Sequence, residues 1–256
     1  MSALHYQIHQ HESDKPWILL IHGLFGSLDN LAGLRRGLTD EFNVLSIDLP
    51  DHGKSAHTKE FSFENYASLV CQLIKECHIT RLNIVGHSLG GKIAMQLTLM
   101  EAGLIDRLVV LDIAPVSYSP RHQAVFSGLD NVVLDQLSSR QDADLALQSH
   151  IQEQSTRQFL LKSLERGENA WRWQFNLPLL KRDYAKISAA IEADKPSPVP
   201  TLFIKGELSD YLNADHKTQI LHLFPNSQLK ILANTGHWLH AEKPGLCVKM
   251  IKSFLS

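Results

Sequence analysis

Hydrophobic residues gather in short continuous runs along this chain rather than alternating with polar ones. Six such runs lie at positions 17–21, 44–47, 82–85, 108–111, 201–204 and 229–232. Runs of this kind are typical of parallel strands buried on both faces, because helices cover both sides of a parallel sheet. The pattern predicts six buried strands. Residues 4–10 predict a further, antiparallel strand at the edge of the sheet.

Between several of these runs the apolar residues recur at steps of three and four. In residues 63–78 they mark one face of a helix. Residues 90–100 predict a second helix. A third is predicted at 244–255, which begins with proline, a residue favoured at the first helical position. Alternation of strands and helices predicts the α/β class with a mostly parallel sheet.

The alternation stops between about residues 116 and 195, where polar residues are frequent and apolar residues keep a helical spacing. This stretch ends in PSPVP, residues 196–200, which cannot be helical. We predict one discontinuous α/β core domain, residues 1–115 and 200–256, with an inserted helical cap at 116–199. The alternative is that these helices cover the sheet in the ordinary way.

Composition narrows the choice of function. The 256 residues are 44% hydrophobic and carry a formal net charge of -2, so neither nucleic acid nor a membrane is expected as a partner. We expect no signal peptide in MSALHYQ and no membrane helix. Three cysteines fit a reducing, cytoplasmic compartment. A monomer or a small homo-oligomer is expected.

The segment NIVGHSLGGKIAM, residues 83–95, carries two overlapping motifs. Gly86, Ser88 and Gly90 form G-x-S-x-G, a strand-to-helix turn that exposes a serine nucleophile. The same segment approaches a phosphate-binding loop at Lys92, but Ile93 stands where that loop needs Ser or Thr to hold magnesium. We therefore predict that Ser88 is a nucleophile and that no cofactor or metal is required.

A serine nucleophile needs a base and two N–H donors for the oxyanion. Among the histidines, His237 is favoured as the base because it follows the last predicted strand, at the same edge of the sheet as the serine. His240 is the alternative. The backbone N–H of Leu89 is one expected donor. The other is expected from the glycine-containing loop after residues 17–21, with Leu24 favoured over Phe25.

The segments that carry these residues resemble a known family. In chain order they are IHGLFGSLDNL, DLPDHGKS, GHSLGGKIAM, LDIAPVSY and TGHWLHAEKP. Together they resemble the α/β-hydrolase superfamily and, within it, the YbfF-type esterases, over essentially the whole chain. The resemblance implies the α/β-hydrolase fold and a helical cap above the serine. It also implies hydrolysis of carboxylic esters, with acyl-CoA thioesters as a further substrate class.

The acid that orients the histidine has three candidates. In much of the superfamily it lies three residues after the glycine that ends the strand at 201–204, but that position holds Ser209, with Glu207 and Asp210 out of register. A second location in the superfamily follows the preceding strand and here holds Asp112. The resemblance favours Asp112, with Ser209 as an additional hydrogen-bonding member of the site. Asp210 and Glu207 stay as alternatives.

The remaining expectations concern the substrate pocket. Phe25 and Trp238 are expected to line it. Arginines of the cap either meet a phosphate-bearing substrate such as a CoA ester or form a solvated face; they are Arg121, Arg157, Arg166 and Arg172. Asp51 and His52 are outside candidates for catalysis. Two other functions remain open: carbon–carbon hydrolysis or lyase chemistry on the same fold, and a non-catalytic small-molecule receptor.

Overall fold

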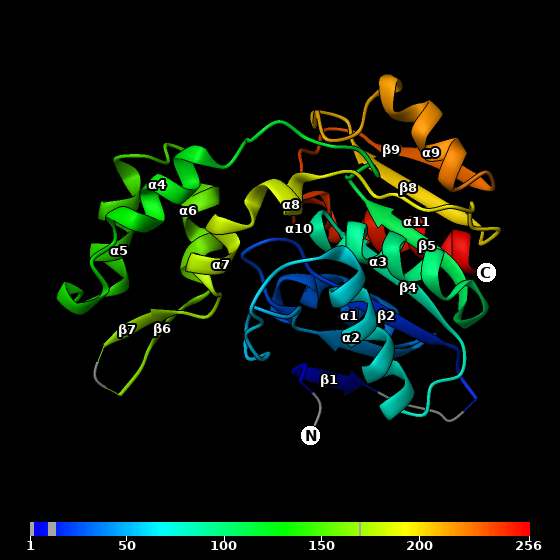
Figure 1. The fold of residues 1–256 in the computed structure, drawn as a ribbon, viewed down its shortest axis with the longest axis horizontal. Helices are drawn as coiled ribbons and strands as arrows, with labels where there is room; N and C mark the ends of the chain where they lie inside the picture. Colours follow the sequence, from blue (N-terminus) through cyan, green and yellow to red (C-terminus); the bar gives the residue numbers. More distant parts are fainter. Residues whose placement is uncertain (1–2, 10–13, 169) are drawn as a thin grey trace.

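The computed structural model describes residues 3–9, 14–168 and 170–256. Two of the stretches discussed from the sequence extend beyond the described residues. They are the N-terminal stretch MSALHYQ, at residues 1–2, and the expected edge strand 4–10, at residue 10. The main sheet has the order β1-β3-β2-β4-β5-β8-β9 (Figure 1). Its strands are β1 (Tyr6–His9), β2 (Trp17–Ile21), β3 (Asn43–Ile47), β4 (Leu82–His87), β5 (Ile105–Leu111), β8 (Thr201–Gly206) and β9 (Ser227–Leu232). β1 is antiparallel to β3 and the other pairings are parallel, which confirms the predicted fold class.

Helices cover both faces of the sheet. One face carries α2 (Phe63–Glu76) and α3 (Leu89–Met100), and the other carries α1 (Ala32–Leu38) and α11 (Pro244–Leu255). Successive strand residues point to opposite faces. In β2, Leu19 therefore packs with the α2–α3 side, and Ile18 packs with the α1–α11 side. This two-sided cover explains why the strands appear in the sequence as continuous apolar runs.

Strand β9 differs from the expectation of burial on both faces. Leu229 is 57% exposed and Ile231 is 55% exposed. β9 is the last strand of the sheet, and α9 (Lys217–Leu223) leaves part of it uncovered. The apolar run indicated a strand correctly, but a run of letters does not state whether that strand lies at the centre or at the edge.

The segment between β5 and β8 lies mainly to one side of the sheet, with α4, α5, α6 and a hairpin at the left of Figure 1. Its helices are α4 (Gln123–Asn131), α5 (Arg140–Gln148), α6 (Gln154–Leu161), α7 (Leu177–Arg182) and α8 (Tyr184–Ser188). The hairpin joins β6 (Leu164–Arg166) to β7 (Trp171–Trp173) and was not predicted. Strands of three residues are too short to show an alternating pattern. The division into core and cap stays a prediction.

The remaining helices are short turns that connect these elements. They are η1 (Leu28–Leu31), η2 (Ala102–Leu104), η3 (Leu134–Gln136), η4 (Ala214–His216) and α10 (Leu239–Glu242).

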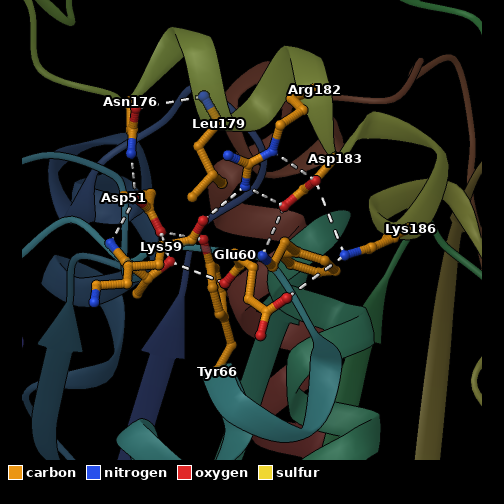
Figure 2. A network of polar contacts seen from close by, with 11 residues as sticks. Asp51, Lys59, Glu60, Tyr66, Asn176, Leu179, Arg182, Asp183 and Lys186 are labelled. Atoms are coloured by element: carbon orange, nitrogen blue, oxygen red, sulfur yellow. Dashed lines mark hydrogen bonds and ion pairs between the residues drawn. The ribbon is translucent and has the colours of Figure 1, made fainter.

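A polar network joins α7 to the loop before α2 (Figure 2). The buried Asp51 carboxylate accepts hydrogen bonds from Tyr66 Oη at 2.6 Å and from Asn176 Nδ2 at 2.7 Å. Nearby, Asp183 accepts hydrogen bonds from the backbone N–H of Phe61 and from Arg182. The Arg182 guanidinium holds the pKa of the Asp183 carboxyl well below its usual range. These hydrogen bonds give Asp51 a structural role, in place of the catalytic role for which it was an outside candidate.

A buried lysine joins α3 to two places in the segment between β5 and β8, one shortly after β5 and one at the end of α8. Lys92 Nζ donates hydrogen bonds to the carbonyl oxygens of Val116 at 2.9 Å and Ser188 at 3.3 Å, and also to that of Ala189. It lies 4.9 Å from the ring centre of Tyr118. Burial lowers the pKa of Lys92 to about 7. The helix that begins next to Ser88 is thus tied to both of these places in the segment.

Candidate active site

Ser88 occupies a sharp turn between β4 and α3. Its backbone is in the left-handed region, with φ 53° and ψ -120°, which is uncommon and strained for a residue with a side chain. The turn closes because Gly86 and Gly90 lack side chains: a Cβ on Gly86 would overlap the carbonyl of Gly90, and one on Gly90 would overlap that of His22. The half-buried Ser88 side chain lines a cavity of about 300 Å³.

His237 and Asp112 meet at the same edge of the sheet. His237 Nδ1 lies 2.7 Å from Asp112 Oδ2. Asp112 directly follows β5 and is fully buried. The Gly206 N–H donates to its Oδ1 at 3.0 Å, and the Ser209 hydroxyl donates to its Oδ2. The carboxylate therefore accepts three hydrogen bonds, one of them from the imidazole.

The two alternative acids lie elsewhere. Asp210 is exposed, and Glu207 accepts a hydrogen bond from the backbone N–H of Asn234. Within the described parts of the chain, Asp112 is the one carboxylate that hydrogen-bonds to the His237 ring. The geometry therefore favours Asp112 as the orienting acid, as the resemblance does.

Two side chains that sequence reasoning did not assign to the site hold His237 in place. The ring of Tyr211 stacks on the imidazole with centroids 4.0 Å apart and an interplanar angle of 23°. His87 Nε2–H donates to the carbonyl of His237 at 2.9 Å. The alternative base His240 packs on His87 at 4.2 Å, and the cavity lining includes His237 and His87 but not His240. The position of His87 directly before Ser88 is the sequence feature that could have pointed to its role.

The loop after β2 lies against Ser88. A Cβ on Gly23 would come within 3.1 Å of the Ser88 Cβ. His22 braces this loop, because its Nε2 accepts the Leu49 N–H at 3.0 Å while its Nδ1–H donates to the Gly23 carbonyl at 2.8 Å. In the described part of the chain, neither the Leu24 nor the Leu89 backbone N–H donates to a protein acceptor. Both amides are thus available to an oxyanion.

The choice between Leu24 and Phe25 as the first donor is not decided by hydrogen bonding. Phe25 adopts φ 62°, and its ring packs on Phe126 at 5.6 Å and on Phe175 at 5.1 Å. Both residues line the 300 Å³ cavity with Ser88. Leu24 as the donor stays a prediction.

The cavity walls include Phe25 and Trp238, the two pocket residues expected from the sequence. Of the four arginines expected to belong to the cap, Arg121 also lines the cavity. Arg157 instead pairs with Asp144 at 2.9 Å, and Arg172 donates to Glu165 at 2.6 Å. Among the described residues, no group of three or more His, Cys, Asp or Glu side chains is placed to hold a metal ion.

Gly206 permits the loop that carries His237 to lie beside the end of β8. A Cβ at this position would overlap the carbonyl oxygen of Gly236. Gly206→Ala is therefore expected to displace His237 and to lower kcat/KM for an ester about 10²-fold, with a loss of unfolding free energy of about 1–3 kcal/mol. Steady-state kinetics and urea unfolding measure the two effects.

The matched control is Gly103→Ala, because a Cβ on Gly103 meets nothing within 4 Å. It should leave kcat/KM unchanged. Equal activity of Gly206→Ala and the wild type would show that the loop adapts and that His237 does not depend on this close approach.

Several buried histidines are neutral in the folded protein. Burial lowers the pKa of His22 and His87, and lowers it to about 3 in His52 and His240; in the half-buried His122, desolvation lowers it to about 4. In the unfolded chain these groups bind protons near pH 6.5, while in the folded protein they do so only at lower pH. Stability from this source is therefore complete above pH 6.5 and is lost as the pH falls.

For His52 and His240 the expected loss at pH 5 is about 2 kcal/mol each. Urea unfolding at pH 7.5, 6.0 and 5.0 measures the free energy of unfolding. A free energy that stays constant over this range would contradict the burial of neutral histidines.

Comparison with known proteins finds similarity over nearly the whole chain. The family model described as the alpha/beta hydrolase fold matches residues 16–244. Esterase YbfF of Escherichia coli (strain K12) is 36% identical over 251 residues, which cover 98% of this chain and 97% of that protein. The sn-1-specific diacylglycerol lipase ABHD11 of Mus musculus is 33% identical over 261 residues, covering 99% and 85%.

One solved structure is also similar at the level of sequence. It is described as a marine microorganism esterase and matches with a TM-score of 0.95 at 32% identity, over 98% of both chains. In the described part of this chain, no helix has the length and apolar character needed to cross a membrane.

Proposed function

The chain belongs to the α/β-hydrolase family, and from this premise we propose that it is a serine esterase with Ser88 as nucleophile, His237 as base and Asp112 as orienting acid. One observation carries the proposal. The strained turn presents Ser88 to the same cavity as His237. The Nδ1 atom of this histidine lies 2.7 Å from the buried Asp112 carboxylate. Relatives named as an esterase and a lipase support the reaction class.

In the proposed first half-reaction, Ser88 Oγ attacks the acyl carbonyl and transfers its proton to His237 Nε2. The bond from Oγ to the carbonyl carbon forms, and negative charge develops on the carbonyl oxygen. The N–H groups of Leu24 and Leu89 stabilise that charge. Collapse of the tetrahedral intermediate breaks the bond to the leaving alcohol, which takes the proton from His237 Nε2 and departs. An acyl-enzyme remains.

In the second half-reaction a water molecule takes the place of the alcohol. His237 accepts its proton, the hydroxide attacks the acyl carbon, and the proton returns to Ser88 Oγ as the acid is released. Throughout, the Asp112 carboxylate holds the Nδ1–H of the ring, so that Nε2 is free to accept a proton. Ser209 and the Gly206 N–H hold the carboxylate in turn.

Residues 116–199 act in this proposal as a cap on the core formed by 1–115 and 200–256. They supply part of the wall of the Ser88 cavity, from α4, from α6 and from the turn between α5 and α6. Because Arg121 contributes a cation to that wall, acyl-CoA thioesters are included in the proposed substrate class. KM for an acyl-CoA, compared between Arg121→Ala and the wild type, tests only the inclusion of acyl-CoA thioesters. An unchanged KM would count against that inclusion and leave the esterase proposal intact.

The test of the proposed function is hydrolysis of a short-chain p-nitrophenyl ester by the wild type and by Ser88→Ala. Release of nitrophenol that depends on Ser88 supports it.

A further inference from the structure

Ser88 stands between two cavities of very different size. The larger, of about 300 Å³, is lined by His237 and Trp238. The smaller, of about 40 Å³, lies on the side of α3 and α8 and is lined by Leu89 and Ile187. We infer that the protein acts on esters of short acyl groups with larger alcohols, the acyl group entering the small cavity and the alcohol the large one. This inference rests on the proposed esterase function and adds its substrate class.

The position of His237 sets which side receives the alcohol. The leaving oxygen must take its proton from His237, so the alcohol leaves on the side where this ring stands. That ring lines the large cavity and is absent from the lining of the small one. The acyl group is bonded to the opposite side of the carbonyl carbon. It therefore points towards the small cavity, next to the Leu89 N–H that is proposed to hold the oxyanion.

The walls of the small cavity are held firmly. Ile187 of α8 is 5% exposed, and Ile113 after β5 is 4% exposed. Lys92 also lines it, and its Nζ already donates hydrogen bonds to the carbonyls of Val116 and Ser188. Because these contacts tie α3 to two places in the segment between β5 and β8, the cavity resists widening. A longer chain must displace this packing to enter.

The volume of the small cavity limits the length of the acyl group that can enter it. A water-sized group needs about 10–15 Å³ of such space, so a cavity of about 40 Å³ accepts about three carbons beyond the carbonyl. That range runs from acetyl to butyryl. The 300 Å³ cavity accepts a much larger alcohol. Beyond the catalytic groups, its wall combines apolar side chains such as Phe159 and Trp238 with polar ones, among them Arg121, His150, Glu153 and Thr156.

The experiment varies the acyl chain while the leaving group stays constant. We expect kcat/KM for p-nitrophenyl acetate and butyrate to exceed that for the octanoate by at least about tenfold. A second series keeps the acyl group as acetate and enlarges the alcohol from ethyl to 2-phenylethyl, which should raise kcat/KM. Octanoate hydrolysed as well as butyrate, or better, would overturn the inference and leave the esterase function intact.

Two matched variants test the assignment of each cavity. Ile187→Ala enlarges the small one, and Ile151→Ala enlarges the large one; both residues are buried isoleucines of the cap, 5% and 3% exposed. Ile187→Ala should raise the octanoate-to-acetate ratio of kcat/KM about tenfold, and Ile151→Ala should leave that ratio within about twofold of the wild type. A raised octanoate-to-acetate ratio in Ile151→Ala, with an unchanged ratio in Ile187→Ala, would place the acyl chain in the large cavity.

These experiments distinguish a failure of the acyl-chain inference from a failure of the proposed esterase function. If Ile187→Ala does not fold, the acyl series on the wild type still decides the question. Absence of hydrolysis of every ester that depends on Ser88 would overturn the proposed function together with the inference.

Discussion

Ser88→Ala should reduce kcat for a p-nitrophenyl ester by about 10⁴–10⁶-fold, leaving only what binding and the oxyanion donors supply. The reason is chemical: the substitution removes the oxygen that forms the acyl-enzyme. It does not remove the strained backbone, since alanine also carries a Cβ at φ 53°. Folding stability should therefore change little.

The measurement compares burst and steady-state release of nitrophenol by wild type and variant, prepared side by side. Thermal unfolding of both proteins is the control, and the midpoints should agree. Activity retained by a folded Ser88→Ala protein would end the serine-esterase proposal. Carbon–carbon bond cleavage or ligand binding without turnover would then be the functions to test on this fold.

Asp112→Asn should lower kcat by about 10³–10⁴-fold while KM changes little. The carboxylate accepts hydrogen bonds from three donors: His237 Nδ1–H, the Ser209 hydroxyl and the Gly206 N–H. An asparagine amide replaces one acceptor oxygen with an N–H₂ group, which must then face one of these donors. If it faces the imidazole, it favours the wrong tautomer, in which Nε2 carries the proton and cannot act as base.

The matched control is Asp210→Asn, the same substitution at the residue directly before Tyr211. Asp210 is exposed, and the His237 ring has its bond with Asp112 instead. Its activity should stay within about twofold of wild type. Ser209→Ala should fall between the two variants, because it removes one of three donors and leaves the charge. A large loss in Asp210→Asn with none in Asp112→Asn would reverse the assignment of the acid.

Strong local signals made much of the fold predictable. The β2 run at Trp17–Ile21 became a strand with the expected bounds, and helix α11 begins at Pro244 as its proline indicated. Elements with weak local signals were missed. The β6–β7 hairpin has only three residues in each strand, and the exposed face of β9 follows from its place at the edge.

The residues of the proposed site were also predictable only where the local sequence signal is strong. The serine turn is encoded within a few residues, because Gly86 and Gly90 must be small wherever strand and helix close around Ser88. The orienting acid is not encoded locally. Asp112 and Asp210 both follow strands, and the letters alone left both open. Register across β5 and β8 places Asp112 beside Gly206, where His237 hydrogen-bonds to it, while the turn after Gly206 presents Ser209 and leaves Asp210 exposed.

By itself, the sequence determined the α/β class, the positions of the main-sheet strands along the chain and the turn that carries Ser88, since short-range sterics and burial patterns control these features. Tertiary structure alone decided the contacts around His237, including the stacked Tyr211 and the His87 hydrogen bond. It also decided the unequal cavities on the two sides of Ser88. These depend on distances between segments far apart in the chain, and no local pattern of residues specifies such distances.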